Sequence, residues 1–538
     1  MIFKIIKWNL IIFIYALMAY GCFPSKKAVK VEPVEYQTGT KIKTPTKVFL
    51  KDSSVAIFNK GFTAEDDTIK GVGTRHWLTY DIEKDHLQIP IDSIATMTTY
   101  QRTQNEGTIL GSAILGVTGT ILTPLSVYCI SCPKCCFGSC PTVYTTDGEN
   151  YELEAELFSY SLSRFFQETD VDRLIQKPTK EGLFSLRLTN EALETHYINQ
   201  FLLQAVHHPQ NSTIYPTADG NIVSVGQLKS PSSVSDSYGR DIKSLLSNRD
   251  TSWFKGVSDR FEKAENSLSR DWLTLTMAVP DTADTVKLVL KLRNTLLSTA
   301  LFYDVVLASQ GLKALEWTHR LNSDSLYAAL YHMAYGSFSG MDIKVQYFDQ
   351  QRKPFWKQVN SFRDVGPIAW KELAVELPVY RDTQGEMSIR LEWFPDNFMI
   401  DFLGYDIESN ISNEAITSEQ LTPTVVENNK GEATPEIITK IAAKDVNFLI
   451  TNPGDTYYFH YMVPTKEETA TTLLLRSSGY YTEWLRGSWI TSPKGEYTFN
   501  LFEPDKTLEK LKQSWKDNRS LLESTFFKTR IPLKGNLQ

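Results

Sequence analysis

Residues 139–157 read Ser-Cys-Pro-Thr-Val-Tyr-Thr-Thr-Asp-Gly-Glu-Asn-Tyr-Glu-Leu-Glu-Ala-Glu-Leu, and this stretch decides the expected fold. The Asp147-Gly148 pair tolerates the positive φ of a hairpin turn, and residues that favour β-strands precede and follow it. The stretch therefore predicts two antiparallel strands joined by a tight turn. Glu152, Glu154 and Glu156 alternate along the second strand, so we expect them to share one solvated face.

Similar strand-like runs recur after this hairpin, separated by Asp, Gly, Pro and Ser turns. They lie at 183–188, 197–207, 272–278, 285–292, 341–348, 370–377 and 387–393. Seven or more such runs are typical of a β-sandwich. Residues 294–338 change to a helical spacing of apolar residues, which predicts a helical insertion within a β-sandwich region that spans 131–407.

The last part of the chain has a different composition. Residues 408–440 lose aromatics and gain Ser, Thr, Asn, Glu and Pro, so they are interpreted as a linker. Residues 441–538 predict a further β segment followed by an amphipathic helix. Four apolar residues share one face of that helix: Leu508, Leu511, Trp515 and Leu522.

Residues 48–105 alternate short β-rich runs with turn residues, which predicts a small β domain, a barrel of about five strands. Residues 106–130 follow as an apolar, Gly-rich helix. At about twenty residues it is long enough to be weighed as a membrane segment. The alternative is a helix packed on the protein itself or on an oligomeric partner. The expected fold class is mainly β (α+β): a small barrel, then a β-sandwich region with a helical insertion and a C-terminal helix.

The N-terminus has the form of an export signal, with Lys4 and Lys7 before an apolar run. The segment ends at Ala-Tyr-Gly-Cys, in residues 19–22, which resembles the lipobox of bacterial lipoproteins. The resemblance implies a signal peptide at 1–21, a lipid on Cys22 and a tether at 22–47. It places the protein in the cell envelope, as an outer-membrane lipoprotein that faces the periplasm or the cell surface. The alternatives are an uncleaved anchor helix, or cleavage elsewhere with Cys22 incidental.

Five of the six cysteines lie close together in the sequence: Cys129, Cys132, Cys135, Cys136 and Cys140. Their spacing comes near to a ferredoxin pattern, but no choice of four cysteines satisfies all its gaps. Four thiolates also suit structural zinc. Export to an oxidising compartment favours disulfides instead, with one cysteine left over. We therefore expect disulfides here and no cofactor, with structural zinc at the cluster as the alternative.

Three resemblances to known families bear on architecture. The block Cys-Pro-x-x-Tyr-x-x-Asp-Gly at 140–148 resembles a family of uncharacterised bacterial lipoproteins and surface proteins, over about 140–405. The Lys-Asp-Ser turn at 51–53 and the Ile-Asp-Ser-Ile segment at 91–94 resemble SH3-like domains of small bacterial lipoproteins. Residues 342–401 resemble galactose-binding-like jelly rolls. These families imply a fold and carry over no activity.

Composition narrows the function classes. With 538 residues, 42% of them hydrophobic, the chain is globular and not disordered. Its net charge of -7 gives no electrostatic reason to bind nucleic acid. Neither a Walker loop nor a G-x-S-x-G motif occurs, so the sequence carries no recognisable catalytic motif.

The expected function is a lipid-anchored cell-envelope protein with a non-catalytic binding or scaffold role. Its partners would be the membrane, through the lipid, and an envelope protein or glycan. The alternatives are a carbohydrate-binding surface lipoprotein and a hydrolase with an unrecognised active site.

Overall fold

The computed structural model contains two compact units, one within residues 1–127 and one from residue 128 onward. Each unit is described by itself. The described residues are 28–33, 39, 41–44, 46–50, 55–58, 60–76, 82–103, 140–146, 151–192, 194–250, 252–310, 314–407, 416–452, 454–464, 466, 469–483 and 504–525. Among them, no helix combines the length and the apolar character that a membrane crossing needs. The predicted apolar helix at 106–130 lies outside the described residues, so it stays a prediction.

The first unit is one antiparallel sheet with a small apolar core. Its strands are β1 (Ala28–Pro33), β2 (Lys41–Ile42), β3 (Thr46–Leu50), β4 (Val55–Phe58), β5 (Phe62–Glu65), β6 (Thr68–His76), β7 (Ile82–Pro90) and β8 (Ile94–Thr103). The order is β1-β8-β3-β4-β6-β5-β2, with β7 on β6. Among the described strands, β1 and β2 end this order and do not pair, so the predicted barrel is an open sheet here. The likeness to SH3-like domains stays a prediction.

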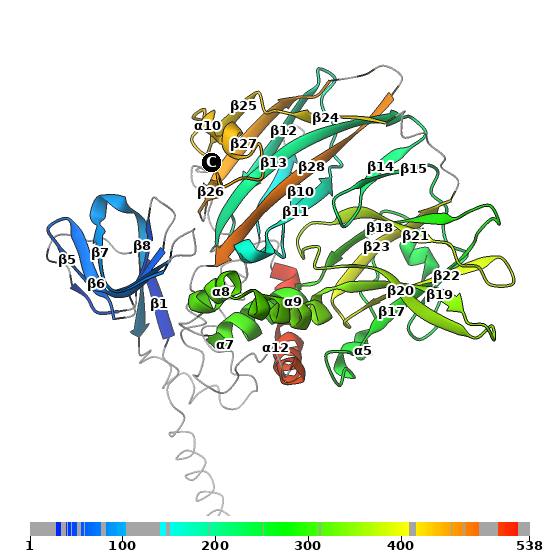
Figure 1. The fold of residues 1–538 in the computed structure, drawn as a ribbon, viewed down its shortest axis with the longest axis horizontal. Coiled ribbons are helices and arrows are strands. Elements are labelled where there is room, and N and C mark those ends of the chain that lie inside the picture. The colour runs from blue at the N-terminus through cyan, green and yellow to red at the C-terminus, as the bar shows by residue number, and fades with distance from the viewer. Residues whose placement is uncertain are drawn as a thin grey trace, which may run out of the picture. The chain divides into compact units, whose positions relative to one another are not determined.

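The chain is mainly β, as predicted. The second unit begins with a sandwich of two five-stranded sheets. One sheet has the order β10 (Tyr151–Glu156), β9 (Thr142–Thr146), β12 (Leu183–Thr189), β27 (Thr456–Met462) and β25 (Val425–Asn428). The other has β11 (Glu168–Arg173), β28 (Thr469–Glu483), β13 (Glu194–Pro209) and β24 (Thr417–Leu421), with β26 (Leu449–Thr451) also on β13. Figure 1 shows the long strands β13 and β28 side by side.

This first sandwich is built from two parts of the chain that are far apart in sequence. The rings of Phe201 on β13 and Phe459 on β27 meet across it at 4.7 Å, and both are fully buried. Residues 142–209 therefore form one core with residues 417–483. The C-terminal β segment completes a sandwich that the N-terminal half begins.

The predicted linker at 408–440 differs from the structure in its described part, residues 416–440. It holds β24, β25 and α10 (Glu436–Lys440). Both strands lie at the edges of their sheets, β24 on β13 and β25 on β27. Edge strands commonly carry polar and charged residues, which explains why this stretch looked like a connection in the sequence.

A second sandwich is inserted between β13 and β24. Its larger sheet has the order β16 (Ser233–Asp236), β17 (Asp271–Ala278), β22 (Glu386–Trp393), β19 (Met341–Phe348) and β20 (Pro354–Phe362). The smaller sheet has β21 (Lys371–Pro378), β18 (Thr285–Asn294) and β23 (Phe398–Asp406). Alternate residues of β18 enter the shared core, because successive side chains of a strand point to opposite faces.

Helices occupy the stretch where the helical insertion was predicted. They are α6 (Leu296–Ala300), the π-helix η4 (Leu301–Leu307), α7 (Ala308–Gln310), α8 (Ala314–Ser323) and α9 (Ser325–Ser339). The C-terminal helix α12 (Pro504–Thr525) packs on α6 and η4. Its Leu508, Leu511 and Trp515 are buried, and the Trp515 indole donates to Asp396 Oδ2 at 2.6 Å. The predicted C-terminal helix is thus present and docked through its apolar face.

A short hairpin lies between the two sandwiches. It consists of β14 (Thr213–Pro216) and β15 (Ile222–Val225). Ile214 packs with residues of the first sandwich, whereas Tyr215 packs on the smaller sheet of the second. Because neighbouring strand residues point to opposite sides, the hairpin contacts both sandwiches at once.

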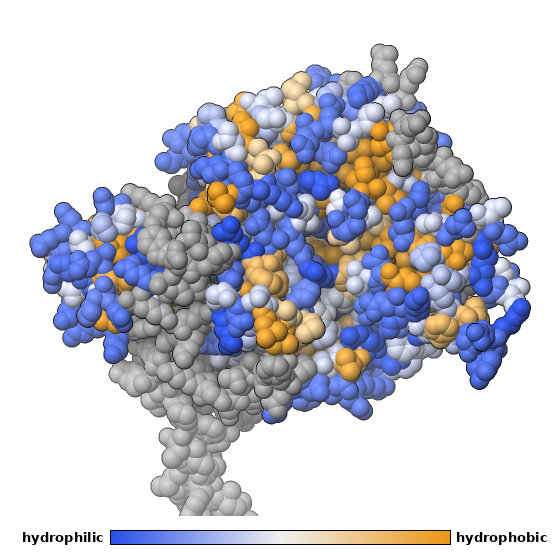
Figure 2. All heavy atoms as spheres, viewed as in Figure 1, coloured by the Kyte–Doolittle hydropathy of each residue, from blue (hydrophilic) through white to orange (hydrophobic). Residues whose placement is uncertain are grey.

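Figure 2 shows that apolar residues on one face of the molecule form separate patches within a mostly hydrophilic surface.

Candidate functional site

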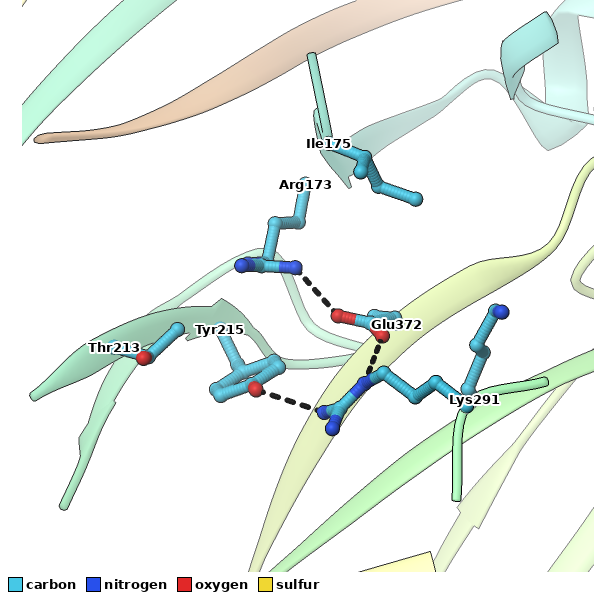
Figure 3. Close-up of a pocket in the computed structure, with 7 residues that line it drawn as sticks. Arg173, Ile175, Thr213, Tyr215, Lys291 and Glu372 are labelled. Carbon is cyan, nitrogen blue, oxygen red and sulfur yellow. Dashed lines mark hydrogen bonds and ion pairs between the residues drawn. The ribbon is translucent and has the colours of Figure 1, made fainter. Parts of the chain in front are cut away.

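A cleft of about 430 Å³ opens beside this hairpin, where the two sandwiches meet. Its size lies in the range of typical small-molecule sites. The residues that line it are Arg173, Ile175, Thr213, Tyr215, Arg249, Lys291 and Glu372. Figure 3 shows Arg173 and Glu372 pointing toward one another, with the Tyr215 ring beside them.

The charged and polar side chains of the cleft come from different strands and loops of the two sandwiches and the hairpin. Arg173 is the last residue of β11, and Tyr215 lies on β14. Lys291 of β18 and Glu372 of β21 are direct cross-strand partners, so their side chains share the outer face of the smaller sheet. Arg249 follows the short 3-10 helix η3 (Lys243–Leu246). The cleft therefore depends on the packing of the two sandwiches, not on one local motif.

The centre of the cleft is an ion-pair group that we call the glutamate triad: Glu372 with Arg173 and Arg249. Arg173 Nη1 donates to Glu372 Oε2 at 2.5 Å, and Arg249 Nε donates to Oε1 at 2.6 Å. The Glu372 side chain is only 4% exposed, whereas the two arginine side chains are 22% and 34% exposed. One buried carboxylate thus orients two partly exposed guanidinium groups (Figure 3).

Aromatic rings fix the planes of both arginines. The Arg173 guanidinium lies 5.1 Å from the centre of the Tyr215 ring, and that of Arg249 lies 3.9 Å from the Phe402 ring. Arg249 Nη2 also donates to the Tyr215 hydroxyl at 3.0 Å. Burial raises the pKa of Tyr215, so this hydroxyl stays protonated. Stacking and hydrogen bonding together hold the two cations before any ligand arrives.

Several donors of these arginines are uncommitted. A guanidinium carries five N–H groups, of which Arg173 gives one to Glu372, and Arg249 gives one to Glu372 and one to Tyr215. The other N–H groups have no hydrogen-bond partner among the described residues, and because Arg173 Nε is buried, the donors of Arg173 that remain open to a ligand are on its Nη atoms. Planar guanidinium groups suit carboxylate and phosphate oxygens, which they contact with two parallel hydrogen bonds. The glutamate triad therefore offers a preformed anion-binding surface.

Lys291 supplies a third cation. Its Nζ lies 2.7 Å from Asp401 Oδ2 and 5.7 Å from the ring centre of Trp370. Asp401 sits where the pairing of β18 with β23 shifts register, and such a bulge redirects a side chain. The residues that line the cleft thus include three cations and one carboxylate, Glu372, and the buried Asp401 pairs with one of these cations from behind.

A second ion-pair group, the lysine triad, lies next to the glutamate triad: Lys371 with Asp170 and Asp172. Lys371 Nζ contacts the Asp170 carboxylate and lies 3.2 Å from Asp172 Oδ1. Burial, together with the Asp170 charge, raises the pKa of Asp172 to about 7 despite the nearby lysine. The two triads join β11 of the first sandwich to β21 of the second.

Most of the predicted site residues lie outside the described residues: Cys22, Cys129, Cys132, Cys135 and Cys136. Predictions about them stay predictions. Cys140 is described, and its buried thiol donates to the Ser159 carbonyl at 3.8 Å. It has no disulfide partner among the described residues.

Burial raises the pKa of the Cys140 thiol well above its usual value, and the charge of Glu156 adds to this. The disulfide, zinc and iron–sulfur alternatives for Cys140 stay predictions. In the described part of the chain, no three His, Cys, Asp or Glu side chains are grouped as metal ligands would be.

The predicted solvated face of residues 152–156 is wrong for two of its three carboxylates. Glu154 and Glu156 are buried. The pairing of β10 with β9 shifts register between Leu153 and Ala155, which removes the expected alternation. The Glu154 carboxylate accepts hydrogen bonds from the backbone N–H groups of Ile175 and Gln176, which follow β11 in the chain. The Glu156 carboxylate accepts one from the backbone N–H of Ile368. Both carboxylates therefore join separate parts of the fold.

A buried polar network that the sequence did not indicate lies where η4 packs on the first sandwich. The Tyr303 hydroxyl contacts the carboxylates of Glu194 and Glu483, which are opposite each other on β13 and β28. His196 Nε2 lies 3.2 Å from Glu194 Oε2, and burial lowers the pKa of His196 to about 3, so its ring is neutral. All four side chains are buried, which suits a structural role.

No protein-family model matches the sequence, and a search of curated proteins gives no match. Among solved structures, the chain is similar to the enzymatically active domain of tailspike protein 4 of bacteriophage CBA120. Identity is 9%, the match covers 29% of this chain and 17% of that chain, and the TM-score is 0.16. It is also similar to the GH31 alpha-xylosidase Xac1773 from Xanthomonas citri, with 8% identity, coverage of 80% and 38%, and a TM-score of 0.17. The chain thus spans less than half the length of either protein, and such TM-scores show no shared fold.

Proposed function

We propose that this protein is a lipid-anchored protein of the cell envelope with a non-catalytic binding role, and that its inter-sandwich cleft binds an anionic ligand. The observation that carries this proposal is the glutamate triad. One buried carboxylate holds two arginines whose remaining N–H groups have no hydrogen-bond partner among the described residues. The anchor on Cys22 comes from the sequence alone and is tested on its own.

The binding role follows from how the cations are held. Ordering a flexible side chain on binding costs free energy, about 0.5–1.5 kcal/mol for each one. The arginines of the glutamate triad are already fixed by Glu372 and by ring stacking. An incoming anion then gains charge-assisted hydrogen bonds without most of that cost. Such fixed ion pairs suit recognition of a ligand.

The cleft is tested with full-length protein in detergent, titrated with acetate and inorganic phosphate in a calorimeter. Arg249→Ala removes a partly exposed cation while Arg173 still contacts Glu372. Because hydrogen bonds to charged groups contribute about 1.5–3 kcal/mol, we expect anion affinity to fall by about 10- to 100-fold. Lys353→Ala is the matched control, since it removes one positive charge from the exposed β19–β20 turn. Equal affinities of the two variants would refute the proposal for the cleft.

The anchor is tested by mass spectrometry and fractionation of the wild type and Cys22→Ser. We expect the wild-type chain to begin at a lipid-modified Cys22 and to sediment with membranes. The variant should lose the lipid and leave the membrane fraction. An unmodified Cys22 in the wild type would contradict the anchor and leave the cleft assignment standing.

A further inference from the structure

The lysine triad holds an amine against two carboxyl groups where the two sandwiches are joined. Lys371 Nζ contacts Asp170 Oδ1 and lies 3.2 Å from Asp172 Oδ1. Asp170 and Asp172 are alternate residues of β11, so their side chains lie on the same face of that strand. Formation of an amide bond needs these three groups: an amine, the carboxyl group that it attacks, and a second acid that carries protons.

The backbone of Phe158 orients the Asp170 carboxyl group and prepares it for attack. Its N–H donates to Asp170 Oδ2 at 3.1 Å, while Lys371 Nζ contacts the other oxygen, Oδ1. A backbone N–H in this position stabilises the negative charge that develops on a carboxyl oxygen when an amine adds to its carbon. Phe158 also has a φ of 35°, a left-handed conformation that costs a non-glycine residue free energy and that clusters at functional sites.

Asp172 is suited to carry protons between the other two groups. Burial, together with the Asp170 charge, raises the pKa of Asp172 to about 7, so part of the population holds this proton at neutral pH. Burial alone would lower the pKa of Lys371, but the charges of Asp170 and Asp172 raise it above its usual value. Lys371 therefore rests as an ammonium group. When Asp172 gives its proton to Asp170 and takes one from Lys371, a neutral amine faces a neutral acid, and burial favours these uncharged forms.

From these contacts we infer that Lys371 and Asp170 form an intramolecular isopeptide bond, which joins the two sandwiches covalently. The inference goes beyond the proposed function and does not depend on the ligand of the cleft. In the first step Lys371 Nζ bonds to Asp170 Cγ, and the C=O electron pair moves onto Oδ2, which accepts the Phe158 N–H.

In the second step the Cγ–Oδ1 bond breaks and Oδ1 leaves as water. Its two protons come from the Lys371 ammonium group, and Asp172 carries them and regains its own. An ammonium group and a carboxylate thus become one amide and one water, without oxidation or reduction and without a further reactant. The bond removes one positive and one negative charge together, so the net charge of the lysine triad stays the same.

A second lysine–aspartate pair provides an internal comparison. Lys291 Nζ lies 2.7 Å from Asp401 Oδ2, and both residues belong to the smaller sheet of the second sandwich. Among the described residues, no second carboxylate lies within ion-pair distance of Lys291. This pair therefore lacks the proton carrier that Asp172 provides to Lys371, and we expect it to stay unlinked.

Trypsin digestion and mass spectrometry of the purified full-length protein test the bond. Trypsin does not cleave after an acylated lysine, so the digest should contain one branched peptide of residues 165–173 and 364–381, lighter than its two parts by one water. Fragmentation should place the link between Asp170 and Lys371, and cleavage after Lys291 should be normal. Complete cleavage after Lys371 with an unmodified peptide 165–173 would overturn the inference, and so would a link to Asp172.

Variants separate the isopeptide bond from the ion pair. Lys371→Arg keeps the positive charge but removes the amine, so the branched peptide should be absent. Asp172→Asn keeps both reacting groups and removes the proton carrier, so the linked fraction soon after synthesis should fall at least about tenfold. Lys353→Arg, on the exposed β19–β20 turn, is the matched control and should link like the wild type. Linkage of Asp172→Asn at the rate of the wild type would contradict the inferred reaction.

Discussion

The lysine triad and the glutamate triad are near mirror images at neighbouring positions. Lys371 and Glu372 are consecutive residues of β21, and each contacts two side chains of opposite charge. The first triad has a net charge of -1 and the second +1 when all groups are ionised. They differ in access to solvent. Lys371 and Asp172 are 11% and 7% exposed and only Asp170 reaches 20%, whereas both arginines of the glutamate triad, at 22% and 34%, line the cleft.

Burial determines what each triad does with its excess charge. In the lysine triad the excess is negative and enclosed, and a raised pKa at Asp172 lets a proton neutralise it. In the glutamate triad the excess is positive and open, and arginine does not release its proton in the accessible pH range. That excess is available to an external anion. The same motif therefore acts as a joint between sandwiches in one place and as a binding surface in the other.

The largest effect is expected from Lys371→Met, which removes the only cation of the lysine triad. The enclosed Asp172 and the partly exposed Asp170 then lose this partner, and breaking a buried pair in this way costs about 3–5 kcal/mol. We expect the free energy of unfolding to fall by that amount in urea titrations followed by tryptophan fluorescence. Lys353→Met, at the exposed β19–β20 turn, is the control. A loss below about 1 kcal/mol would mean that the lysine triad is not a joint.

A smaller effect, dependent on pH, is expected from Asp172→Asn. The folded-state pKa of about 7 exceeds the unfolded value of about 3.9. The folded chain therefore binds the extra proton between these values, and this contribution to stability is lost as pH rises from about 4 through 7. The variant should lose this dependence and gain stability relative to wild type as pH rises.

Unfolding midpoints measured from pH 4 to pH 8 check this, with Glu181→Gln as the exposed control. Parallel pH profiles for wild type and Asp172→Asn would show that Asp172 is ionised throughout this range in the folded protein.

Glu372→Gln should have the smallest effect on stability of these three variants. It should strengthen anion binding, whereas Arg249→Ala should weaken it. The arginines of the glutamate triad are partly exposed, so losing this charge should cost about 1 kcal/mol. The variant removes the negative charge beside the two arginines and keeps an amide oxygen that accepts a hydrogen bond, so we expect affinity for inorganic phosphate to increase several-fold. Calorimetric titration measures the change. Weaker phosphate binding in the variant would show that Glu372 orients the arginines more than its charge opposes the anion.

The fold class was predictable because strand patterns are local. On β18, Leu288, Leu290 and Leu292 recur at every second position, and the core of the second sandwich receives all three as the pattern indicates. The pairing of distant segments was not predictable, since a polar edge strand such as β24 resembles a linker in composition. Local alternation also failed at Glu154, where a register shift reverses the expected face.

The cleft itself carried no sequence signal. Arg173 and Glu372 are 199 positions apart, and Arg249 is 123 positions from Glu372. Each looks like an ordinary charged residue at or near the end of a strand or turn. Their meeting depends on how the second sandwich is inserted into the first and on the hairpin between them. The contact between these three side chains depends on tertiary packing, so it cannot be predicted from the periodicity or spacing of residues within one segment.

The most direct test of the central claim is a crystal structure of the full-length protein with acetate. The account predicts the acetate carboxylate within hydrogen-bond distance of Arg173 and Arg249, inside the cleft. Acetate bound elsewhere, with the cleft empty and the glutamate triad unchanged, would contradict it.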